Sequence, residues 1–276
     1  LSISFFFFLS SNLHTYTHAR VGTCFGWAWF GNSIVAIIAG QMASAAATWN
    51  ASNNKEDPTG PFKLSVGFLM IGLVLVLTLW KENYGTRGSE NGSSTKDQIV
   101  STWNKIMSDN KIKYVGAVQS LFEGSMYVFV LAWAPCVKTF AAEGEIVPFG
   151  KVFSCFMVSC MIGSSLFGEF MKYNPVERFM PKVLFVASAS LALSSILQSS
   201  FFAVVLGFLL FEGTVGLYFP SINTLRSSYI PNTIRSTAMN IFRVPLNMIV
   251  VTLNLSVKAI GTSGALIASS GLLLMA

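Results

Sequence analysis

Apolar segments long enough to cross a membrane recur along the whole chain, and they constrain its fold more than any other feature. A bilayer-spanning helix needs about 20 mostly apolar residues. Hydrophobic residues make up 53% of the chain and charged residues only 11%, whereas soluble domains carry about 25% charged residues. We therefore predict an all-α, polytopic membrane protein with eight candidate segments: Val21–Thr48, Leu64–Trp80, Val115–Val137, Val152–Phe170, Val183–Leu197, Phe201–Phe219, Thr237–Val257 and Gly264–Ala276.

The limits of some segments carry further information. Only Gln198-Ser199-Ser200 separates the fifth candidate from the sixth, which predicts a tight helical hairpin. The eighth candidate has 13 residues, too few to span a bilayer, so we expect the last helix to be truncated. Residues 1–24 begin without Met and lack the basic stretch that opens a secretory signal. We treat these residues as a doubtful leader and assign them no function.

The polar stretch Lys81–Lys113 is rich in Gly, Ser and charge, and we expect a loop there with a surface helix around Gln98–Met107. Lys and Arg are more frequent on the cytoplasmic side of membrane proteins. If this loop is cytoplasmic, that side holds twelve of the 18 basic residues, with Lys105 and the loop residue Arg226 among them. The other side holds five, including Lys138, and Arg243 lies inside a helix. We therefore predict that the loop faces the cytoplasm.

Arg243 lies in the middle of an apolar run, STAMNIFRVPLNMIVVTLNLSVKAI. An arginine at the centre of a bilayer helix costs about 2.5–3.5 kcal/mol on insertion scales, so its default interpretation is functional. At about 100° per residue, five polar side chains fall within about 60° of one another: Ser236, Asn240, Arg243, Asn247 and Asn254. Lipid cannot satisfy such a polar stripe, which therefore predicts contact with protein or with a watery path.

Two glutamates also lie deep in apolar segments. Glu123 shares a helix face with Gln119 and Tyr127, which precede and follow it by one turn. Glu212 stands beside Gly213, one of the small residues that allow a neighbouring helix to approach closely. Each carboxyl has two interpretations that the sequence leaves open: it pairs with Arg243, or it takes up a proton and serves a proton relay.

Several function classes lack their motifs. The sequence has no Walker loop, no Gly-rich dinucleotide motif and no HExxH, and its histidines are His14 and His18 in the doubtful leader. The four cysteines have no zinc-site spacing. The net charge of +6 is scattered between apolar runs, which argues against a nucleic-acid surface. We expect no enzyme, no cofactor or metal, and no nucleic-acid partner.

Five stretches are more specific in residues and order than the apolar runs around them: WKENYG, QSLFEGSMYVFVLAWAP, FSCFMVSCMIGSSLFG, LLFEGTVGLYFPSINTLRSSYIP and NIFRVPLN. In order and spacing they resemble the molybdate-anion transporter family of the major facilitator superfamily, from about Phe25 to the C-terminus. The matched polar and proline positions are Gln119, Glu123, Glu212, Tyr218, Pro220, Arg226, Asn240, Arg243 and Pro245.

The resemblance implies a carrier of twelve helices in two six-helix halves around a central path. Residues 25–80 would be the last two helices of the first half, 81–113 the cytoplasmic central loop, and 114–276 the second half. The bundle would then be incomplete, with about eight of twelve helices, and a full carrier would require the missing first-half helices. Alternation would come from rocking of the two halves.

We therefore expect a secondary-active carrier in the plasma membrane that takes up a small oxyanion, with molybdate as the first candidate. Arg243, Asn240 and Asn247 would bind the anion, since guanidinium and amide groups donate to its oxygens. Tyr127 and Gln119 would donate from a facing helix. Glu123 or Glu212 would carry a proton if transport is proton-coupled, or hold Arg243 when the site is empty. The alternatives are a carrier of sulfate or a sugar, a truncated non-transporting membrane scaffold and, more distantly, a membrane-embedded enzyme that uses the two glutamates.

Overall fold

The structure of the chain is a computed structural model that describes residues 18–49, 59–80, 95–140, 147, 149–197 and 200–276. Every regular element in these ranges is a helix, and seven of the helices are long and apolar enough to cross a membrane. The all-α, multi-pass prediction is confirmed. The helices are α2 (His18–Trp49), α3 (Gly60–Leu79), α4 (Thr95–Ser108), α5 (Asn110–Lys138), α6 (Phe149–Tyr173), α7 (Val176–Ile196), α8 (Phe201–Tyr229) and α9 (Asn232–Met275).

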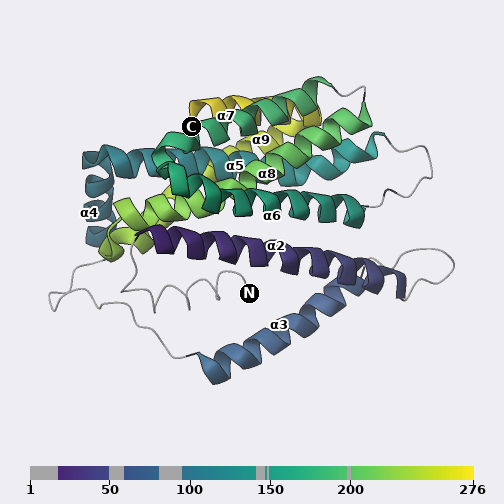
Figure 1. The fold of residues 1–276 in the computed structure, drawn as a ribbon, viewed down its shortest axis with the longest axis horizontal. Helices are drawn as coiled ribbons and strands as arrows, with labels where there is room; N and C mark the ends of the chain where they lie inside the picture. The colour runs from purple at the N-terminus through teal and green to yellow at the C-terminus, as the bar shows by residue number, and fades with distance from the viewer. Residues whose placement is uncertain (1–17, 50–58, 81–94, 141–146, 148, 198–199) are drawn as a thin grey trace.

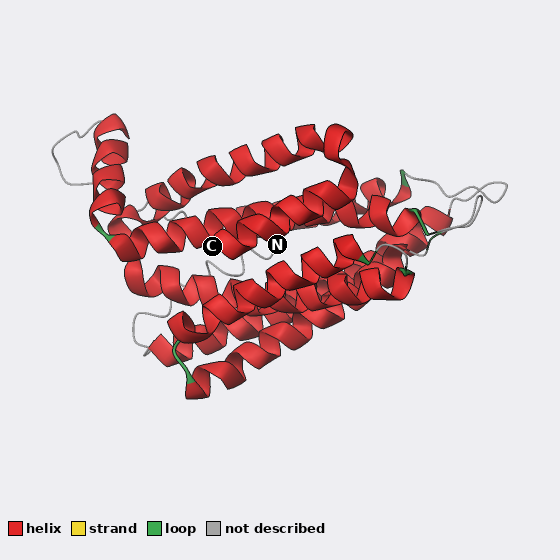
Figure 2. Ribbon diagram, turned by 90° about the horizontal axis from the view of Figure 1, so that it is seen from above, coloured by secondary structure: helices red, strands yellow, loops and turns green. Residues whose placement is uncertain are grey.

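Helix α8 is the central element of the bundle. It packs against α2, α5, α6 and α7, while α9 packs against α5 and α7 (Figures 1 and 2). The predicted hairpin is present, since α7 ends at Ile196 and α8 begins at Phe201 and the two helices lie against each other. Helix α3 instead contacts α2 where Gly60 meets Ala46 and then diverges from the other helices (Figure 1). Its apolar side chains are left uncovered by the described helices.

Helix α8 extends ten residues beyond the predicted end at Phe219, to Tyr229. The hydropathy of the sequence falls at this point, and Pro220 indicates a helix end. In the structure the polar side chains of the added turns bond to the helix's own backbone: the hydroxyls of Ser221 and Thr224 donate to the carbonyls of Leu217 and Pro220 at 2.6 and 2.8 Å. The helix therefore continues without exposing unsatisfied groups.

Helices α6 and α8 cross at a distance that only glycine permits. A Cβ atom on Gly216 would lie 2.0 Å from the carbonyl oxygen of Cys160, and one on Gly163 would lie 2.0 Å from that of Gly213. Small residues of this kind let membrane helices pack backbone to backbone. The Ser159 hydroxyl joins the same pair of helices by donating to the carbonyl of Leu209 at 2.6 Å.

Helix α9 consists of two arms joined at Gly261, whose φ of 73° and ψ of 171° break the helical path. This conformation is open essentially to glycine alone. Ile249 of the first arm contacts Gly124, and Ser269 of the second arm accepts a hydrogen bond from Ser125 at 3.2 Å. Consecutive residues of α5 therefore meet both arms, so the chain folds back at Gly261. The sequence predicted these arms as its seventh and eighth segments.

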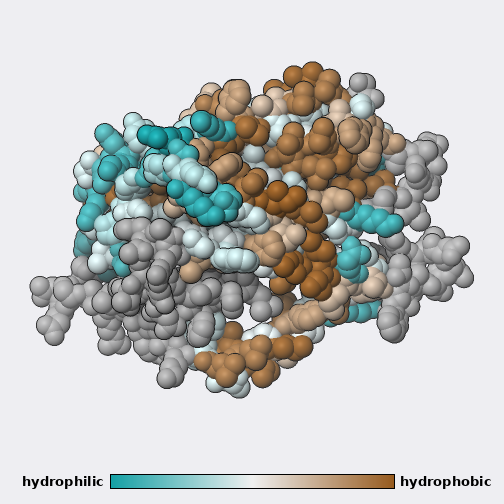
Figure 3. Space-filling model, viewed as in Figure 1, coloured by the Kyte–Doolittle hydropathy of each residue, from teal (hydrophilic) through white to brown (hydrophobic). Residues whose placement is uncertain are grey.

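The polar parts of the chain gather at one end of the bundle. Helix α4, the start of α5, the junction of α6 with α7 and the junction of α8 with α9 lie together there (Figure 1). On the face shown in Figure 3, hydrophilic residues gather over the upper part of this end, a smaller group lies toward the opposite end, and hydrophobic residues dominate the middle. Helix α4 matches the predicted surface helix, while residues 81–94 of the predicted loop and 1–17 of the predicted leader lie outside the described residues. The cytoplasmic sidedness of this end stays a prediction.

Candidate functional site

A partly buried guanidinium joins α8 to α5 near the polar end of the bundle. Arg226 lies one turn before the end of α8, and its Nη2 donates to Oε1 of Glu123 at 2.6 Å. Its Nε donates to Oε1 of Gln119 at 3.2 Å, and its Nη1 donates to Oδ1 of Asn223 at 3.0 Å. Tyr218 completes the group because its hydroxyl donates to Oε1 of Glu123 at 3.4 Å. We call these five residues the Arg226 cluster.

The helical repeat places the cluster's residues side by side. Gln119 and Glu123 lie on consecutive turns of α5, and Asn223 and Arg226 lie on consecutive turns of α8. Side chains of Arg226 and Glu123 are 17% and 16% exposed, and Gln119 is 3% exposed. Charges buried to this degree are tolerated when they are paired and hydrogen-bonded, and removing one partner leaves the other uncompensated.

The predicted anion-binding stripe lies on α9, on a face that the described helices leave uncovered. Asn240, Arg243 and Asn247 are all exposed, while Phe242 and Leu246 between them are buried. The Ser120 hydroxyl donates to the carbonyl of Phe242 at 2.9 Å. This contact fixes the register of α9 on α5, so Arg243 lies at the same level of α5 as the Arg226 cluster. The cluster and the stripe are thus separate groups at one depth of the bundle.

Of the two interpretations that the sequence left open for Glu123, ion pairing is observed, but with Arg226 and not with Arg243. Glu123 pairs with Arg226, and no hydrogen bond or ion pair joins Arg243 to another described residue. The sequence count placed Arg226 among the loop charges because α8 was predicted to end at Phe219. The extra turns of α8 bring this residue into the bundle, where its long side chain reaches α5. The signal that could have revealed it is the polar face of α5, which requires a partner in a neighbouring helix.

The remaining predicted site residues have different surroundings. Tyr127 lies one turn beyond Glu123 and is 47% exposed. Glu212 is 7% exposed on α8, and its carboxyl makes no hydrogen bond to another described residue. One of its neighbours on α8 is Gly213, which packs against α6. The structure therefore separates the two glutamates: Glu123 has a cation and a phenol as partners, and Glu212 has neither.

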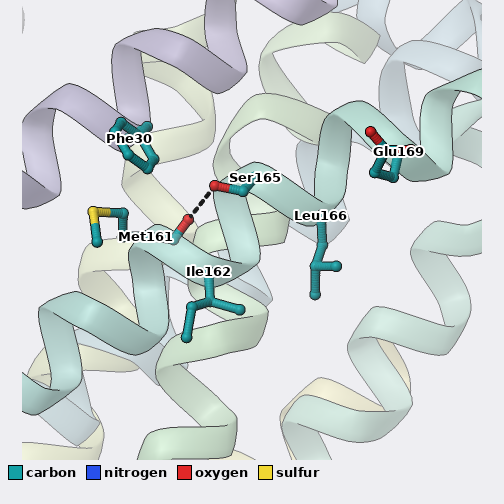
Figure 4. Close-up of a pocket in the computed structure, with 6 residues that line it drawn as sticks. All are labelled: Phe30, Met161, Ile162, Ser165, Leu166 and Glu169. Carbon is teal, nitrogen blue, oxygen red and sulfur yellow. Dashed lines mark hydrogen bonds between the residues drawn. The ribbon is translucent and has the colours of Figure 1, made fainter.

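A surface depression of about 330 Å³ lies elsewhere, between α2 and α6 (Figure 4). Its lining is mainly apolar: Phe30, Met161, Ile162, Ser165, Leu166 and Glu169. The hydroxyl of Ser165 donates to the carbonyl of Met161 at 3.0 Å, and Glu169 pairs with Lys172 at 2.7 Å. The polar groups of the depression are thus already engaged, and no predicted site residue lines it. Within the described residues, no group of three or more His, Cys, Asp or Glu side chains is placed to hold a metal ion.

Comparison with known proteins supports the resemblance drawn from the motifs. A family model described as sugar transporters with twelve transmembrane segments matches residues 3–212. The molybdate-anion transporter of Xenopus laevis is 31% identical over 85% of this chain and 49% of its own length. That of Takifugu rubripes is 28% identical over 86% of this chain and 53% of its own length. The chain belongs to the molybdate-anion transporter family of the major facilitator superfamily.

Membership of the molybdate-anion transporter family agrees with the multi-pass helical fold. The chain spans about half the length of the curated relatives that it matches. Both parts of the candidate site, the Arg226 cluster and the stripe on α9, fall within the described helices of this half. The activity of a complete carrier is therefore a matter for proposal.

Proposed function

We propose that the chain forms part of a secondary-active membrane carrier that moves a small tetrahedral oxyanion, with molybdate as its substrate. The observation that carries the proposal is the similarity, at 31% identity over 85% of the chain, to the molybdate-anion transporter of Xenopus laevis. Two arginines at one depth of an apolar bundle support it. Arginine's planar fork of donors suits an oxyanion better than the compact ammonium of lysine.

Arg243, Asn240 and Asn247 remain the proposed substrate contacts on α9. Their exposed face cannot be satisfied by lipid, so we propose that it borders a watery path between the described bundle and further helices. Tyr127 would contribute its hydroxyl from α5. Pro245 lies inside α9 two residues after Arg243 and lacks the N–H that a helix residue donates, and such prolines occur in transporter helices that line a path. Proton coupling through Glu123 or Glu212, and residence in the plasma membrane, belong to the same proposal.

Uptake measurements test the carrier function directly. The chain would be produced in cells without molybdate uptake, both alone and together with the first half of the Xenopus laevis relative. We expect labelled molybdate to accumulate when both parts are present. The absence of uptake even when both parts are present, with the complete relative active under the same conditions, would favour the truncated, non-transporting scaffold.

Replacing Arg243 with Gln removes the charge and keeps a neutral, shorter hydrogen-bond donor. We expect molybdate uptake to fall by at least about tenfold, because a charge-assisted bond to a buried anion is lost. Asn254→Ala is the matched control on the same helix, since the Asn254 amide donates to the carbonyl of Val250 at 2.8 Å and serves the helix itself. Unchanged uptake by the Arg243→Gln variant would remove Arg243 from the binding role.

A sugar is the second candidate substrate, because the matching family model is described as sugar transporters. Sulfate is a further possibility within the oxyanion class. Competition for uptake distinguishes these substrates. An excess of sulfate should reduce the uptake of labelled molybdate if the site selects its ligand by tetrahedral shape and charge alone. An excess of neutral sugar should leave it unchanged. Inhibition by the sugar and not by sulfate would replace the oxyanion proposal.

A further inference from the structure

In the Arg226 cluster, the carboxylate of Glu123 lies where an oxyanion bound to the Arg226 guanidinium would lie. Its Oε1 accepts hydrogen bonds from Nη2 of Arg226 at 2.6 Å and from the hydroxyl of Tyr218 at 3.4 Å. The second oxygen, Oε2, makes no hydrogen bond to another described residue. A carboxylate and a tetrahedral oxyanion present the same kind of acceptor to such donors. The cluster is therefore an anion-binding arrangement filled by one of the chain's own side chains.

The cluster has more donors than Glu123 uses. A guanidinium carries five N–H groups and no acceptor, so the amides of Gln119 and Asn223 turn their oxygens toward Arg226. The amide nitrogens of both residues make no hydrogen bond to other described residues. Arg226, Tyr218 and these two amides thus offer donors from two helices around one position. An anion with four oxygens could engage more of them than one carboxylate does.

Aromatic packing holds α5 against α8 independently of the ion pair. The rings of Phe122 and Tyr218 stack with centroids 3.7 Å apart. Phe129 packs on Phe208 and Phe211 with centroids 5.1 and 4.8 Å apart. Each such aromatic pair contributes about 0.5–1.5 kcal/mol beyond its buried area. The Glu123–Arg226 pair can therefore open without separating the two helices.

We propose that Arg226 binds the transported oxyanion and that Glu123 is its internal competitor, which occupies the guanidinium while the site is empty. The inference rests on the proposed oxyanion function and assigns a second binding residue to it. Arg226 is 17% exposed and Glu123 16%, so the pair is partly accessible. Arg243 lies at the same level of α5 on the neighbouring helix α9.

Equilibrium binding of molybdate to the purified 276-residue chain in lipid nanodiscs tests the competition. Glu123→Gln keeps the size of the side chain and removes the competing charge. We expect this variant to bind molybdate about tenfold more tightly, as removing a competitor that fills the site most of the time should do. Arg226→Gln should weaken binding by at least about thirtyfold. Glu169→Gln removes the exposed partner of Lys172 and should bind like the unaltered chain.

The outcomes separate this inference from the proposed function. If the unaltered chain binds molybdate and Glu123→Gln binds it equally or more weakly, the competition is overturned while the oxyanion function stands. If neither the chain nor Glu123→Gln binds molybdate or sulfate, alone or together with the first half of the Xenopus laevis relative, both proposals fall. If Glu123→Gln gains affinity for sulfate alone, the competition stands and the molybdate assignment falls.

Two further variants guard against misfolding. Glu123→Asp keeps the charge but shortens the side chain by one methylene, which draws the carboxylate back from Arg226. We expect it to bind molybdate more tightly than the unaltered chain, and weaker binding by a folded Glu123→Asp chain would overturn the competition. The double variant Glu123→Gln with Arg226→Gln replaces the ion pair by two neutral amides. It should keep the helix content of the unaltered chain in circular dichroism and bind no molybdate; binding at unaltered strength would exclude Arg226.

Discussion

Three ionisable residues in the apolar helices differ mainly in what surrounds them. Glu123 has a cation at 2.6 Å, Arg243 lies exposed on α9, and Glu212 is 7% exposed without a hydrogen bond to another described residue. A buried charge without a partner is far more costly than a paired one. The surroundings of the three groups thus differ: Glu123 contacts a guanidinium, Arg243 lies on an uncovered face, and Glu212 is buried without a cation, as the proposed proton coupling through Glu212 would require.

Glu212→Gln tests the role in proton exchange. Glutamine has nearly the same size as glutamate, so the packing between α6 and α8 should be kept. Unlike a carboxyl group, its amide cannot take up and release a proton. We expect the variant, together with the first half of the Xenopus laevis relative, to exchange labelled molybdate across a membrane at equilibrium to the same extent as the unaltered chain. Accumulation driven by an imposed proton gradient should be lost. Glu169→Gln, on an exposed turn of α6, is the matched control, and full gradient-driven accumulation by Glu212→Gln would exclude this residue from coupling.

The sequence predicted one side of the candidate site and not the other. Gln119, Glu123 and Tyr127 share a face of α5 because of the helical repeat alone, so their grouping follows from spacing. The partner of Glu123 is 103 residues away in the chain. That contact depends on how α5 and α8 pack, which one-dimensional spacing does not contain. Arg226 was therefore interpreted as a loop charge that helps to orient the chain.

At the scale of elements, runs of apolar residues were sufficient to find the helices but not their ends. The predicted sixth segment ends at Phe219 and α8 ends at Tyr229, because hydroxyl groups within a helix can bond to its own carbonyls. The break at Gly261 falls in the gap between the seventh and eighth predicted segments. A glycine at this position is visible in the sequence, whereas the reversal of the chain depends on the packing of both arms against α5.

Gly216→Ala tests the close crossing of α6 and α8. Its added methyl group would lie 2.0 Å from the carbonyl oxygen of Cys160 and 2.9 Å from the backbone nitrogen of Ser164. Backbone atoms cannot give way as flexible side chains do, so we expect a loss of at least about 1–3 kcal/mol of stability. Thermal unfolding in detergent, followed by circular dichroism, measures the change.

Gly72→Ala is the control for this substitution. Gly72 lies inside α3, and a Cβ atom there would have no heavy atom within 4 Å. Alanine also favours the helix by about 0.5–1 kcal/mol over glycine. This variant should unfold at the same temperature as the unaltered chain or slightly higher. Equal losses for Gly216→Ala and Gly72→Ala would show that the crossing is not tight.

At the scale of the whole molecule, the alternating directions of the helices bring the basic residues of distant segments to one end. Lys105 on α4 and Lys138 at the end of α5 are both exposed. They mark opposite ends of the bundle, since α4 lies at the start of α5 and Lys138 is its last residue (Figure 1). The Lys and Arg bias predicts that the end with α4 faces the cytoplasm. Cysteine labelling in intact cells tests this orientation without requiring transport.

A membrane-impermeant maleimide should label Lys138→Cys in intact cells. It should label Lys105→Cys only after the membrane is permeabilised, because that residue lies at the predicted cytoplasmic end. The unaltered chain, with its four cysteines, gives the background for both variants. The reverse pattern of labelling would invert the orientation of every described helix and would place the Arg226 cluster near the outer surface.

The Glu123–Arg226 pair also bears on how the polypeptide enters the bilayer during synthesis. Each of these side chains alone would oppose transfer of its segment from the translocation machinery into lipid, where a central charge costs about 2.5–3.5 kcal/mol. Both belong to one contiguous stretch of chain, from α5 to α8, and neutralise each other inside it. This pair can therefore enter the membrane without a net charge of its own during biogenesis.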